Sequence, residues 1–539
     1  MAKLSIDNRA VTVPEGATLL EAARRLGIDV PTLCHRDGVP PQTSCLVCMV
    51  KLVESGRLVP ACATAAEEGM RVESETDEVH HVRRTALELL LSDHLGDCLA
   101  PCDLSCPANM DIPEMLRQIA AGKLREAIAT VKRDIALPAV LGRICPAPCE
   151  KACRRRSIDA AVAICGLKRL VADVDLASEL PYMPPCEPPS GKRVAVVGAG
   201  PTGLAAAYYL TQQGHACMIF EQSPRPGGRL LSETTDEQLP RDVLTAEIDT
   251  IVALGPDLRL NERIADKAAF ERLRDEFDAV LIAAGASSRE QAEAWGLDTT
   301  ARGVEADKQT YQTPLSGTFA AGNAIRGKAL VVRSVADGKE AAVSIGQWLG
   351  CEAVVGPSKP FNTRMGRLEE AELALFLEGA SPGQRKEPSD TADGYTADEG
   401  AAEAARCLHC DCRKLDDCRL RKYAQQYGAN PRRYAAERRP FAQDRHHAEV
   451  IHEPGKCIAC GLCIEIARAA GEPLGLTFVG RGFDVRVAAP LDESLAAALS
   501  RVAAECIAAC PTAALARKQR EGEKSEIRST KSETNSNTK

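Results

Sequence analysis

Several features that would assign this chain to a broad class are absent from its sequence. No stretch reaches the ~18–20 uninterrupted apolar residues of a membrane-spanning helix. The N-terminus enters strand-like sequence without the apolar region of a signal peptide, so a cytoplasmic location is expected. The net charge of −8 is mild and gives no reason to expect a nucleic-acid partner. No P-loop, HExxH or Ser-His-Asp pattern is present, so no side chain is predicted to be a catalytic acid, base or nucleophile.

Cysteine is abundant instead. The chain has 23 cysteines among 539 residues. Disulfide frameworks occur in short secreted domains, whereas grouped cysteines in a long cytosolic chain indicate metal ligands. Nearly all of these cysteines fall into four groups, and iron–sulfur clusters are held mainly by cysteine thiolates at short, fixed spacings. The sequence therefore predicts several iron–sulfur clusters, spread over about three to five domains.

The first cysteine group follows a predicted hairpin at residues 3–13 and a predicted helix at 17–26. Its spacing, Cys34-x10-Cys45-x2-Cys48-x13-Cys62, predicts a [2Fe–2S] cluster. A zinc site is the alternative, because two of the cysteines form a CxxC pair. The long first gap resembles the N-terminal domain of the large iron–sulfur subunit of NADH dehydrogenase, which NAD-linked hydrogenases and formate dehydrogenases also carry. The resemblance continues through a predicted helix at 79–94 and implies a β-grasp ferredoxin fold.

The second group departs from that family. In the family, a histidine and three cysteines ligate a [4Fe–4S] cluster in the order H-x3-C-x2-C-x5-C, whereas the order here is His94-x3-Cys98-x3-Cys102-x3-Cys106. A helical stretch at 112–134 and three further cysteines follow. This arrangement resembles the N-terminal module of the glutamate synthase small subunit and of dihydropyrimidine dehydrogenase, where two [4Fe–4S] clusters are ligated from both halves.

That resemblance implies two sets of ligands. In the family, the second cluster takes its fourth ligand from a side-chain amide or carboxylate, but Lys168 stands at that position here and is a poor ligand while protonated. The alternative for the lone histidine is a capping or surface role. The resemblance implies Cys98, Cys102 and Cys153 for one cluster and Cys106, Cys145 and Cys149 for the other. The candidate fourth ligands are His94 for the first cluster and, for the second, Cys165, which lies three residues before Lys168.

A dinucleotide-binding motif stands between the second and third groups. An apolar strand at 193–197 enters a glycine turn with the G-x-G-x-x-G pattern, a helix leaves it, and a second strand ends at Glu221, where a carboxylate can bind ribose hydroxyls. A purely structural glycine turn is the alternative. The candidate residues are Gly198, Gly200, Pro201, Thr202, Gly203 and Glu221, with Gly228 and Arg229 after the second strand.

The sequence further along favours FAD over NAD. A buried-strand run at 277–285 and a return segment ending in Gly322 and Asn323 resemble FAD enzymes of the glutathione-reductase class and the glutamate synthase small subunit. There an aspartate binds the ribityl chain, and Asn323 takes its place without the charge. The glutamate synthase family inserts an NADPH-binding domain between these strands, but only residues 286–316 lie between them here, and a dinucleotide domain needs on the order of 100 residues. Electrons are therefore expected to enter through another subunit, the clusters or an exposed flavin face.

Two cysteine groups lie near the C-terminus. Cys407-x2-Cys410-x-Cys412-x5-Cys418 predicts a [4Fe–4S] cluster, with zinc as the alternative. The final group is a ferredoxin-like C-x2-C-x2-C with a distant C-P, again with a zinc alternative, and it resembles the NADH dehydrogenase subunit. Its predicted ligands are Cys457, Cys460, Cys463 and Cys510.

These observations predict a multidomain α+β and α/β protein. The expected cofactors are one [2Fe–2S] cluster, three to four [4Fe–4S] clusters and one FAD. The predicted parts are a β-grasp [2Fe–2S] ferredoxin at 1–78, a helical double [4Fe–4S] domain at 79–190, a Rossmann-like FAD domain at 191–352, a linker at 353–402, a cysteine-rich cluster segment at 403–445, a ferredoxin-like [4Fe–4S] domain at 446–516 and a disordered tail at 517–539.

The resemblances imply an electron-transfer subunit of a soluble multi-subunit oxidoreductase. The partners, by analogy, are an NADH-oxidising FMN and iron–sulfur subunit and a terminal metalloenzyme such as a hydrogenase or formate dehydrogenase. Electron bifurcation is compatible with one flavin among several clusters. Two alternatives remain: an autonomous glutamate synthase-like FAD enzyme that uses ferredoxin or NAD(P)H, and an assembly subunit whose flavin site is degenerate.

Overall fold

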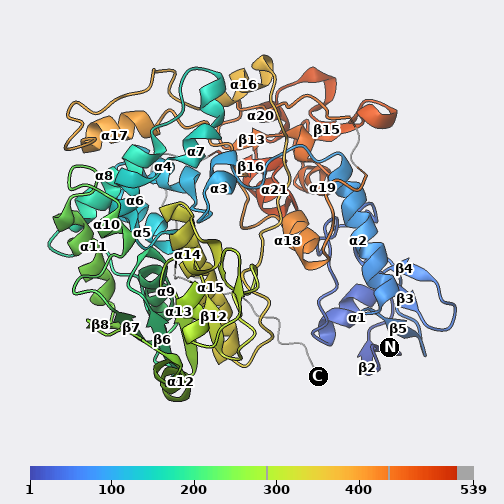
Figure 1. Ribbon diagram of the computed structural model, residues 1–539. Coiled ribbons are helices and arrows are strands. Elements are labelled where there is room, and N and C mark those ends of the chain that lie inside the picture. The colour runs from blue at the N-terminus through green and yellow to red at the C-terminus, as the bar shows by residue number, and fades with distance from the viewer. Residues whose placement is uncertain (287–288, 435–436, 519–539) are drawn as a thin grey trace. The chain divides into compact units, whose positions relative to one another are not determined.

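The protein is described by a computed structural model, which covers residues 1–286, 289–434 and 437–518. The chain forms two compact units (Figure 1). Unit 1 comprises Met1–His94 together with Asp416–Lys539, and unit 2 comprises Leu95–Leu415. Most of the tail predicted to be disordered lies outside the described residues, although Arg517 ends a strand. No described helix is both long and apolar enough to cross a bilayer.

The N-terminal part of unit 1 is a mixed five-stranded sheet in the order β2-β1-β5-β3-β4. Strands β1 and β2 form the predicted hairpin in antiparallel register from Ala2–Val13 to Ile6–Arg9, and β1 pairs with β5 in parallel. A helix packs on the sheet and begins at Thr18, whose side chain accepts from the backbone N–H of Glu21 in a capping box. The elements are β1 (Ala2–Ile6), β2 (Arg9–Val13), α1 (Leu19–Arg25), β3 (Met49–Leu52), β4 (Leu58–Pro60) and β5 (Arg71–Glu73).

The rest of unit 1 consists of short helices and paired strands. Strands β13 and β16 pair antiparallel, as do β14 and β15, and a separate apolar core lies among these elements. The elements are α2 (Asp77–Ser92), α18 (Arg419–Gln426), β13 (Val450–His452), α19 (Leu462–Ala469), β14 (Thr477–Val479), β15 (Arg486–Ala488), α20 (Leu495–Ala498), α21 (Ala503–Ala509) and β16 (Leu515–Arg517).

Unit 2 begins with a module made only of helices. Its apolar faces pack into one large core that continues into the neighbouring sheet. Helix α4, for example, buries Ile112, Met115, Leu116 and Ile119 at helical spacing. The helices are α3 (Pro101–Ser105), α4 (Ile112–Ala120), α5 (Leu124–Asp134), α6 (Pro138–Ile144), α7 (Pro148–Lys151) and α8 (Ile164–Leu176).

The second part of unit 2 is a parallel sheet in the order β12-β9-β6-β7-β8. Helices α9 and α15 pack closely against each other beside this sheet. Their contact needs a glycine, because a Cβ on Gly338 of α15 would lie 2.3 Å from the carbonyl oxygen of Thr202 on α9. The main elements are β6 (Arg193–Val197), α9 (Pro201–Gln212), β7 (Ala216–Glu221), α10 (Arg229–Ser232), α11 (Arg241–Val252), β8 (Asp257–Leu260), α12 (Lys267–Glu276), β9 (Ala279–Ile282), β12 (Thr318–Ala320), α14 (Asn323–Arg326) and α15 (Val331–Leu349).

Residues 353–402 differ from the predicted linker. They belong to unit 2 and contain α16 (Glu370–Leu377) and most of α17 (Ala397–Ala404), which packs against α4 and α8. Tyr395 is buried, and its ring occupies the space that a side chain at Gly166 of α8 would fill, with a Cβ there only 2.7 Å from the ring. The segment therefore returns to the helical module and carries the next cysteines with it.

Candidate functional site

The glycine turn after β6 requires glycine at two of its positions. Gly198 has φ +108°, and a Cβ there would lie 2.7 Å from the carbonyl oxygen of Ala283. A Cβ on Gly203 would lie 1.9 Å from the carbonyl oxygen of Gly198. A Cβ on Gly200 would meet nothing within 4 Å, so this glycine leaves open space in front of the N-terminus of α9. That is where a pyrophosphate is held by backbone N–H groups in dinucleotide folds.

A cavity of about 790 Å³ opens at the carboxyl ends of the strands. Glu221 lies at its edge and accepts hydrogen bonds from the N–H groups of Ala199, at 2.8 Å, and Ser223, at 2.9 Å. Two predicted residues, Gly203 and Gly322, do not line the cavity. Both pack closely beneath the turn, where a Cβ on Gly203 would clash with Gly198 and a Cβ on Gly322 would clash with Thr202. The predicted residues that line it are Gly198, Gly200, Pro201, Thr202, Glu221, Gly228, Arg229 and Asn323.

Asn323 is the most informative polar group in this cavity. It starts α14 and is 6% exposed, and its Oδ1 accepts no hydrogen bond from the described residues. A buried carbonyl oxygen without a donor costs free energy, and a ligand hydroxyl would supply one. The polar groups of the cavity therefore fit a bound dinucleotide whose hydroxyl groups lie near α14.

Ile144 is a cavity residue that the sequence did not indicate. It ends α6 in the helical module and stands directly before Cys145, yet it lines the cavity together with the glycine turn. Sequence reasoning missed it because an isolated isoleucine between two predicted domains carries no motif. Its position makes the dinucleotide cavity a neighbour of the cysteines that follow it.

The first thiol group of unit 2 contains Cys106, Cys145, Cys149 and Cys165 and is called the Cys106 set. A hydrogen bond from Cys165 lowers the pKa of Cys145 to about 6, and the Cys165 thiol also lies 3.3 Å from the carbonyl oxygen of Leu141. Burial raises the pKa of Cys149 to about 12, against the opposing charge of Lys168. The structure thus brings together the four cysteines that were expected to share one cluster.

Lys168 is a buried cation beside the Cys106 set. Burial alone would lower its pKa, but the neighbouring thiolates of Cys165, Cys145, Cys106 and Cys149 raise it. A lysine held protonated cannot ligate iron. Its charge can offset the negative charge of thiolates and of a cluster bound to them.

A second thiol group in unit 2 contains Cys102, Cys153, Cys407 and Cys410 and is called the Cys102 set. Burial, then the charges of Asp103, Cys407, Cys410 and Cys153, raises the pKa of Cys102. Burial also raises the pKa of Cys410 to about 12, where Cys153 adds to the shift and Arg154 opposes it. The expected partners of Cys102 and Cys153 were Cys98 and His94 instead.

Cys98 and His94 are placed differently from that expectation. The sulfur of Cys98 lies 3.4 Å from the hydroxyl oxygen of Thr363, which donates to the carbonyl oxygen of Gly96 at 2.6 Å. His94 belongs to unit 1, where burial and the charge of Lys456 lower its pKa to about 4. Its buried Nδ1 has no hydrogen-bond partner among the described residues.

The predicted cluster at Cys407–Cys418 is divided between the two units. Cys407, Cys410 and Cys412 belong to unit 2, whereas Cys418 belongs to unit 1. There the thiol of Cys418 caps α18 by accepting from the N–H of Arg421 at 3.5 Å, and it lies 3.9 Å from the carbonyl oxygen of Pro511. The physical reason is that α18 docks on the Cys510-Pro511 segment, as a hydrogen bond from Leu420 to Pro511 also shows.

Unit 1 holds the first and last predicted thiol groups. The sulfur atoms of Cys34 and Cys45 are 3.3 Å apart, and their hydrogen bond lowers the pKa of Cys34 to about 5. A hydrogen bond with Cys62 likewise lowers the pKa of Cys48 to about 7. All four of these cysteines are buried. The last group consists of Cys457, Cys460, Cys463 and Cys510, and all four line one small cavity.

Those two groups of unit 1 are neighbours. Arg36, two residues after Cys34, forms an ion pair with Glu505 of α21 at 2.7 Å. Gln42 lies against Gly461, next to Cys460. Among the described residues, no three His, Cys, Asp or Glu side chains are close enough together to hold a single metal ion. Each thiol group named above is therefore a set of neighbouring cysteines and not a formed metal site.

Family models match three parts of this chain. Residues 1–77 match a 2Fe-2S iron–sulfur cluster binding domain. Residues 92–180 match domain II of dihydropyrimidine dehydrogenase, with its 4Fe-4S cluster, and residues 196–259 match an NAD(P)-binding Rossmann-like domain. The predicted [2Fe–2S] domain, [4Fe–4S] module and Rossmann-like domain are therefore confirmed.

Three curated relatives match part of this chain. The chain is 40% identical over 213 residues to the NADP(+)-dependent formate dehydrogenase subunit beta of Moorella thermoacetica, covering 35% of this chain and 30% of the relative. It is 37% identical over 221 residues to the NADPH-Fe(3+) oxidoreductase subunit beta of Geobacter sulfurreducens, covering 40% and 31%. It is 36% identical over 191 residues to the NAD-dependent dihydropyrimidine dehydrogenase subunit PreT of Escherichia coli, covering 35% and 46%. The chain thus spans less than half the length of each relative.

Proposed function

We propose that this chain is an iron–sulfur flavoprotein subunit that passes electrons between a bound FAD, its clusters and partner subunits of an NAD(P)-linked oxidoreductase complex. The observation that carries the proposal is the position of Ile144, which lines the dinucleotide cavity and directly precedes Cys145 of the Cys106 set. Electron transfer needs the two cofactors close together with protein, rather than bulk water, between them. A single isoleucine separates the cavity from the cluster ligands along the chain.

FAD fits the cavity better than a nicotinamide dinucleotide does. Glu221 is placed to accept from ribose hydroxyls, and the free Oδ1 of Asn323 lies on the cavity wall near α14, where the ribityl chain of FAD would supply hydroxyl donors. Between β9 and β12, the described residues form only α13 (Arg289–Ala294) and the two-stranded pair β10 (Thr299–Thr300) and β11 (Gly303–Val304). This leaves the hydride donor to another subunit.

Each element of the chain has a defined task in this proposal. The backbone N–H groups at the start of α9 hold the pyrophosphate, and the buried thiols hold the clusters away from water. A bound flavin would exchange electrons singly or in pairs, which lets two-electron donors communicate with one-electron clusters. Lys168 and Arg154 place positive charge beside the two thiol groups of unit 2, where it favours the reduced clusters.

The partners follow from the missing hydride site and from the names of the relatives. Two of the relatives are beta subunits of a formate dehydrogenase and of an NADPH-Fe(3+) oxidoreductase. We expect an NAD(P)H-oxidising FMN and iron–sulfur subunit on one side of the electron path. On the other side we expect a terminal metalloenzyme of the formate dehydrogenase or hydrogenase type.

An anaerobic titration of the full, cluster-loaded chain tests this function. The visible absorbance is followed while NADH, NADPH and then dithionite are added, and the released dinucleotide is identified after denaturation. We expect FAD in the extract, bleaching by dithionite, and no bleaching by either nucleotide until the nucleotide-oxidising partner is added. Prompt bleaching by a nucleotide alone would show an autonomous enzyme. A chain without flavin would favour the assembly subunit.

A further inference from the structure

The Cys102 set joins cysteines that are far apart in the sequence. Cys102 and Cys153 belong to the helical module, whereas Cys407 and Cys410 follow α17, beyond the whole parallel sheet. Cys102 and Cys407 are buried, and Cys153 and Cys410 are largely so. Cys153 is among the charged groups that act on Cys102, Cys407 and Cys410, and Cys407 and Cys410 also act on Cys102. The four thiols are therefore mutual neighbours.

Backbone and side-chain contacts fix this arrangement independently of the thiols. The N–H of Cys412 donates to the carbonyl oxygen of Cys98 at 3.0 Å. Arg117 of α4 pairs with Asp411 at 2.9 Å. The residues on either side of Cys410 are thus tied to the segment around Cys98 and to α4.

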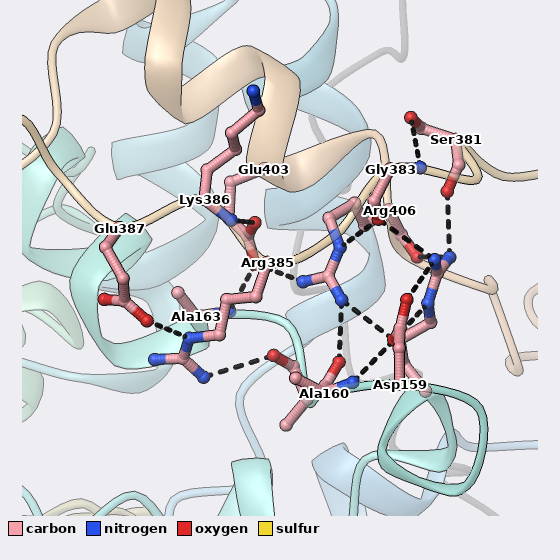
Figure 2. Close-up of polar contacts among 12 residues, drawn as sticks. Asp159, Ala160, Ala163, Ser381, Gly383, Arg385, Lys386, Glu387, Glu403 and Arg406 are labelled. Carbon is pink, nitrogen blue, oxygen red and sulfur yellow. Dashed lines mark hydrogen bonds and ion pairs between the residues drawn. The ribbon is translucent and has the colours of Figure 1, made fainter.

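A network of four charged side chains, three of them buried and Asp159 27% exposed, makes the second attachment, and Figure 2 labels Asp159, Glu403 and Arg406 of this network. The network consists of Arg155, Asp159, Glu403 and Arg406. Arg406 pairs with Glu403 at 2.7 Å and with Asp159 at 2.9 Å. Arg155 donates to the carbonyl oxygen of Arg406 at 3.2 Å and pairs with Asp159 at 2.7 Å. Both arginine side chains are 1% exposed and Glu403 is 0% exposed.

The position of this network in the sequence gives it its meaning. Arg155 stands two residues after Cys153, and Arg406 stands directly before Cys407. Glu403 also accepts from the N–H of Ala163, at the start of α8, at 2.9 Å. Buried charges are costly unless each is paired, so this network tolerates little displacement. It holds the backbone of Cys407 in register with the backbone of Cys153.

Cys98, by contrast, is turned toward another partner. Its sulfur lies 3.4 Å from the hydroxyl of Thr363, and the neighbouring backbone is held by a hydrogen bond from Leu99 to Asn362 at 2.8 Å.

We propose that Cys102, Cys153, Cys407 and Cys410 together ligate one [4Fe–4S] cluster, and that Cys407–Cys418 therefore holds no cluster of its own.

The assignment fixes the number of clusters. It rests on the proposed function only in taking the helical module to carry iron–sulfur clusters. The chain would hold three [4Fe–4S] clusters and one [2Fe–2S] cluster, about 14 iron atoms, whereas a separate cluster at Cys407–Cys418 would raise the total to about 18.

Iron and acid-labile sulfide in the full reconstituted chain test the assignment. The variants are Cys153→Ala, Cys407→Ala and the double variant Cys153→Ala/Cys407→Ala. We expect each single variant to lose about four iron atoms and the double variant to lose no more than either single one. Two separate clusters would instead cost the double variant about eight, and that result would overturn the proposal.

Cys98→Ala is the matched control, because it removes a neighbouring buried thiol that is outside the proposed set. We expect it to keep the full iron content. Loss of about four iron atoms in Cys98→Ala, with none lost in Cys407→Ala, would overturn the proposal in favour of a Cys98-ligated cluster.

A measurement on the wild-type chain avoids variants that fail to fold. The clusters are removed slowly with ferricyanide and a chelator, and alkylation of each cysteine is followed by mass spectrometry. Cys102, Cys153, Cys407 and Cys410 should become reactive with one shared rate constant. Separate rates for Cys102 and Cys153 on one hand and Cys407 and Cys410 on the other would contradict the assignment. The readouts are iron content and cysteine alkylation, and neither needs electron transfer to the flavin or to a partner subunit, so a failure of the proposed function leaves this result intact.

Discussion

The two thiol sets of unit 2 each contain two buried and two partly buried cysteines, yet they are supported in different ways. The Cys106 set comes from one stretch of the helical module, between α3 and the first turn of α8, with Lys168 as its nearby cation. The Cys102 set needs residues from beyond the parallel sheet, with Arg154 as its nearby cation. Near each set, one buried glutamate accepts from backbone N–H groups at the start of a neighbouring helix. Local sequence can place the first set, whereas long-range tertiary contacts must place the second.

The two glutamates show the difference most clearly. Glu247 of α11 accepts from the N–H groups of Ala139 and Val140, at 2.6 and 2.8 Å, and so anchors the start of α6, which leads to Cys145. Glu403 accepts from Ala163 and is paired with Arg406. Both carboxylates accept from two backbone N–H groups, since Glu403 also accepts from Lys386 at 2.7 Å, but Glu403 has a buried cation in addition.

The largest effect is expected from Arg406→Ala. It leaves Glu403 buried without its cation, which lowers the free energy of unfolding by about 3–5 kcal/mol. On the proposed assignment, the variant also loses the iron of the Cys102 set while the Cys106 set keeps its iron. Chemical denaturation and iron analysis measure the two effects.

Arg385→Ala is the control for that variant. Arg385 pairs with Glu150 at 3.0 Å and with Glu387 at 2.9 Å, but its side chain is 29% exposed. We expect a loss of about 1 kcal/mol or less and an unchanged iron content. Equal losses in the two variants would mean that Arg406 has no special part in holding the Cys102 set.

The next effect is a pH dependence from Glu247. Burial raises its pKa from 4.5 to about 7, against the lowering influence of the N–H groups of Val140 and Ala139. Between these two values the folded chain binds more protons than the unfolded chain, so stability is full below about pH 4.5, falls as the pH rises to about 7, and is then level. The contribution is about 3 kcal/mol.

Glu247→Gln isolates that contribution. We expect the variant to lack the part of the stability loss between pH 5 and pH 7.5 that wild type shows in chemical denaturation. Other titrating groups act equally in both proteins, so the difference between the two curves reports on Glu247. Parallel curves would show that its backbone donors keep the carboxylate ionised throughout.

A smaller effect is expected on the reduction potentials. Lys168→Met removes a buried positive charge, which is worth about 2 kcal/mol at ~8 Å and an effective dielectric constant of ~20. The potential of the cluster on the Cys106 set should therefore fall by on the order of 50–100 mV. An EPR-monitored redox titration measures it.

Arg154→Met is the reciprocal test. Arg154 donates to the thiolate of Cys410 and pairs with Asp97. Its loss should lower the potential of the cluster on the Cys102 set and leave the other unchanged. If both variants shift the same signal, the two sets do not hold separate clusters.

The smallest effect on stability is expected at Gly200 of the glycine turn. A Cβ on Gly200 meets nothing within 4 Å, so Gly200→Ala should change the free energy of unfolding by about 1 kcal/mol or less while weakening FAD binding, because it fills the space in front of α9. Gly203→Ala, whose Cβ would clash with the backbone, should destabilise the fold itself. Thermal denaturation and flavin content after dialysis separate the two. Equal flavin loss and equal destabilisation would contradict the open-space argument.

The features of this protein that could be predicted from the sequence are those that a short run of neighbouring residues determines. The strand, glycine turn and helix around Gly198 predict the parallel sheet, and the spacing from Cys34 to Cys62 predicts the first domain, because a few neighbouring residues determine each. Cys106, Cys145 and Cys149 were grouped by a family resemblance and Cys165 was added because it lies near the Lys168 position; the structure places these four thiols near one another.

What the sequence did not indicate depends on distant contacts. Cys407 and Cys418 are close along the chain but belong to different units, and no spacing rule shows where a chain leaves one unit for another. Residues 379–402 have a loop-like composition, yet Tyr395 is buried against Gly166. The charged residues Glu403 and Arg406 are typical of a surface helix and are instead fully buried together.

The Arg155–Arg406 contacts also bear on the order in which the protein is made. During synthesis, Cys153 leaves the ribosome long before Cys407, and the parallel sheet is made in between. All four thiols of the Cys106 set have been made once Cys165 has emerged, and Glu247, which anchors α6, follows later in the chain. A cluster on the Cys102 set has to wait until the flavin domain has been synthesised. On the proposed assignment, truncation before Cys407 would therefore yield a chain with all four thiols of the Cys106 set and only two of the four thiols of the Cys102 set.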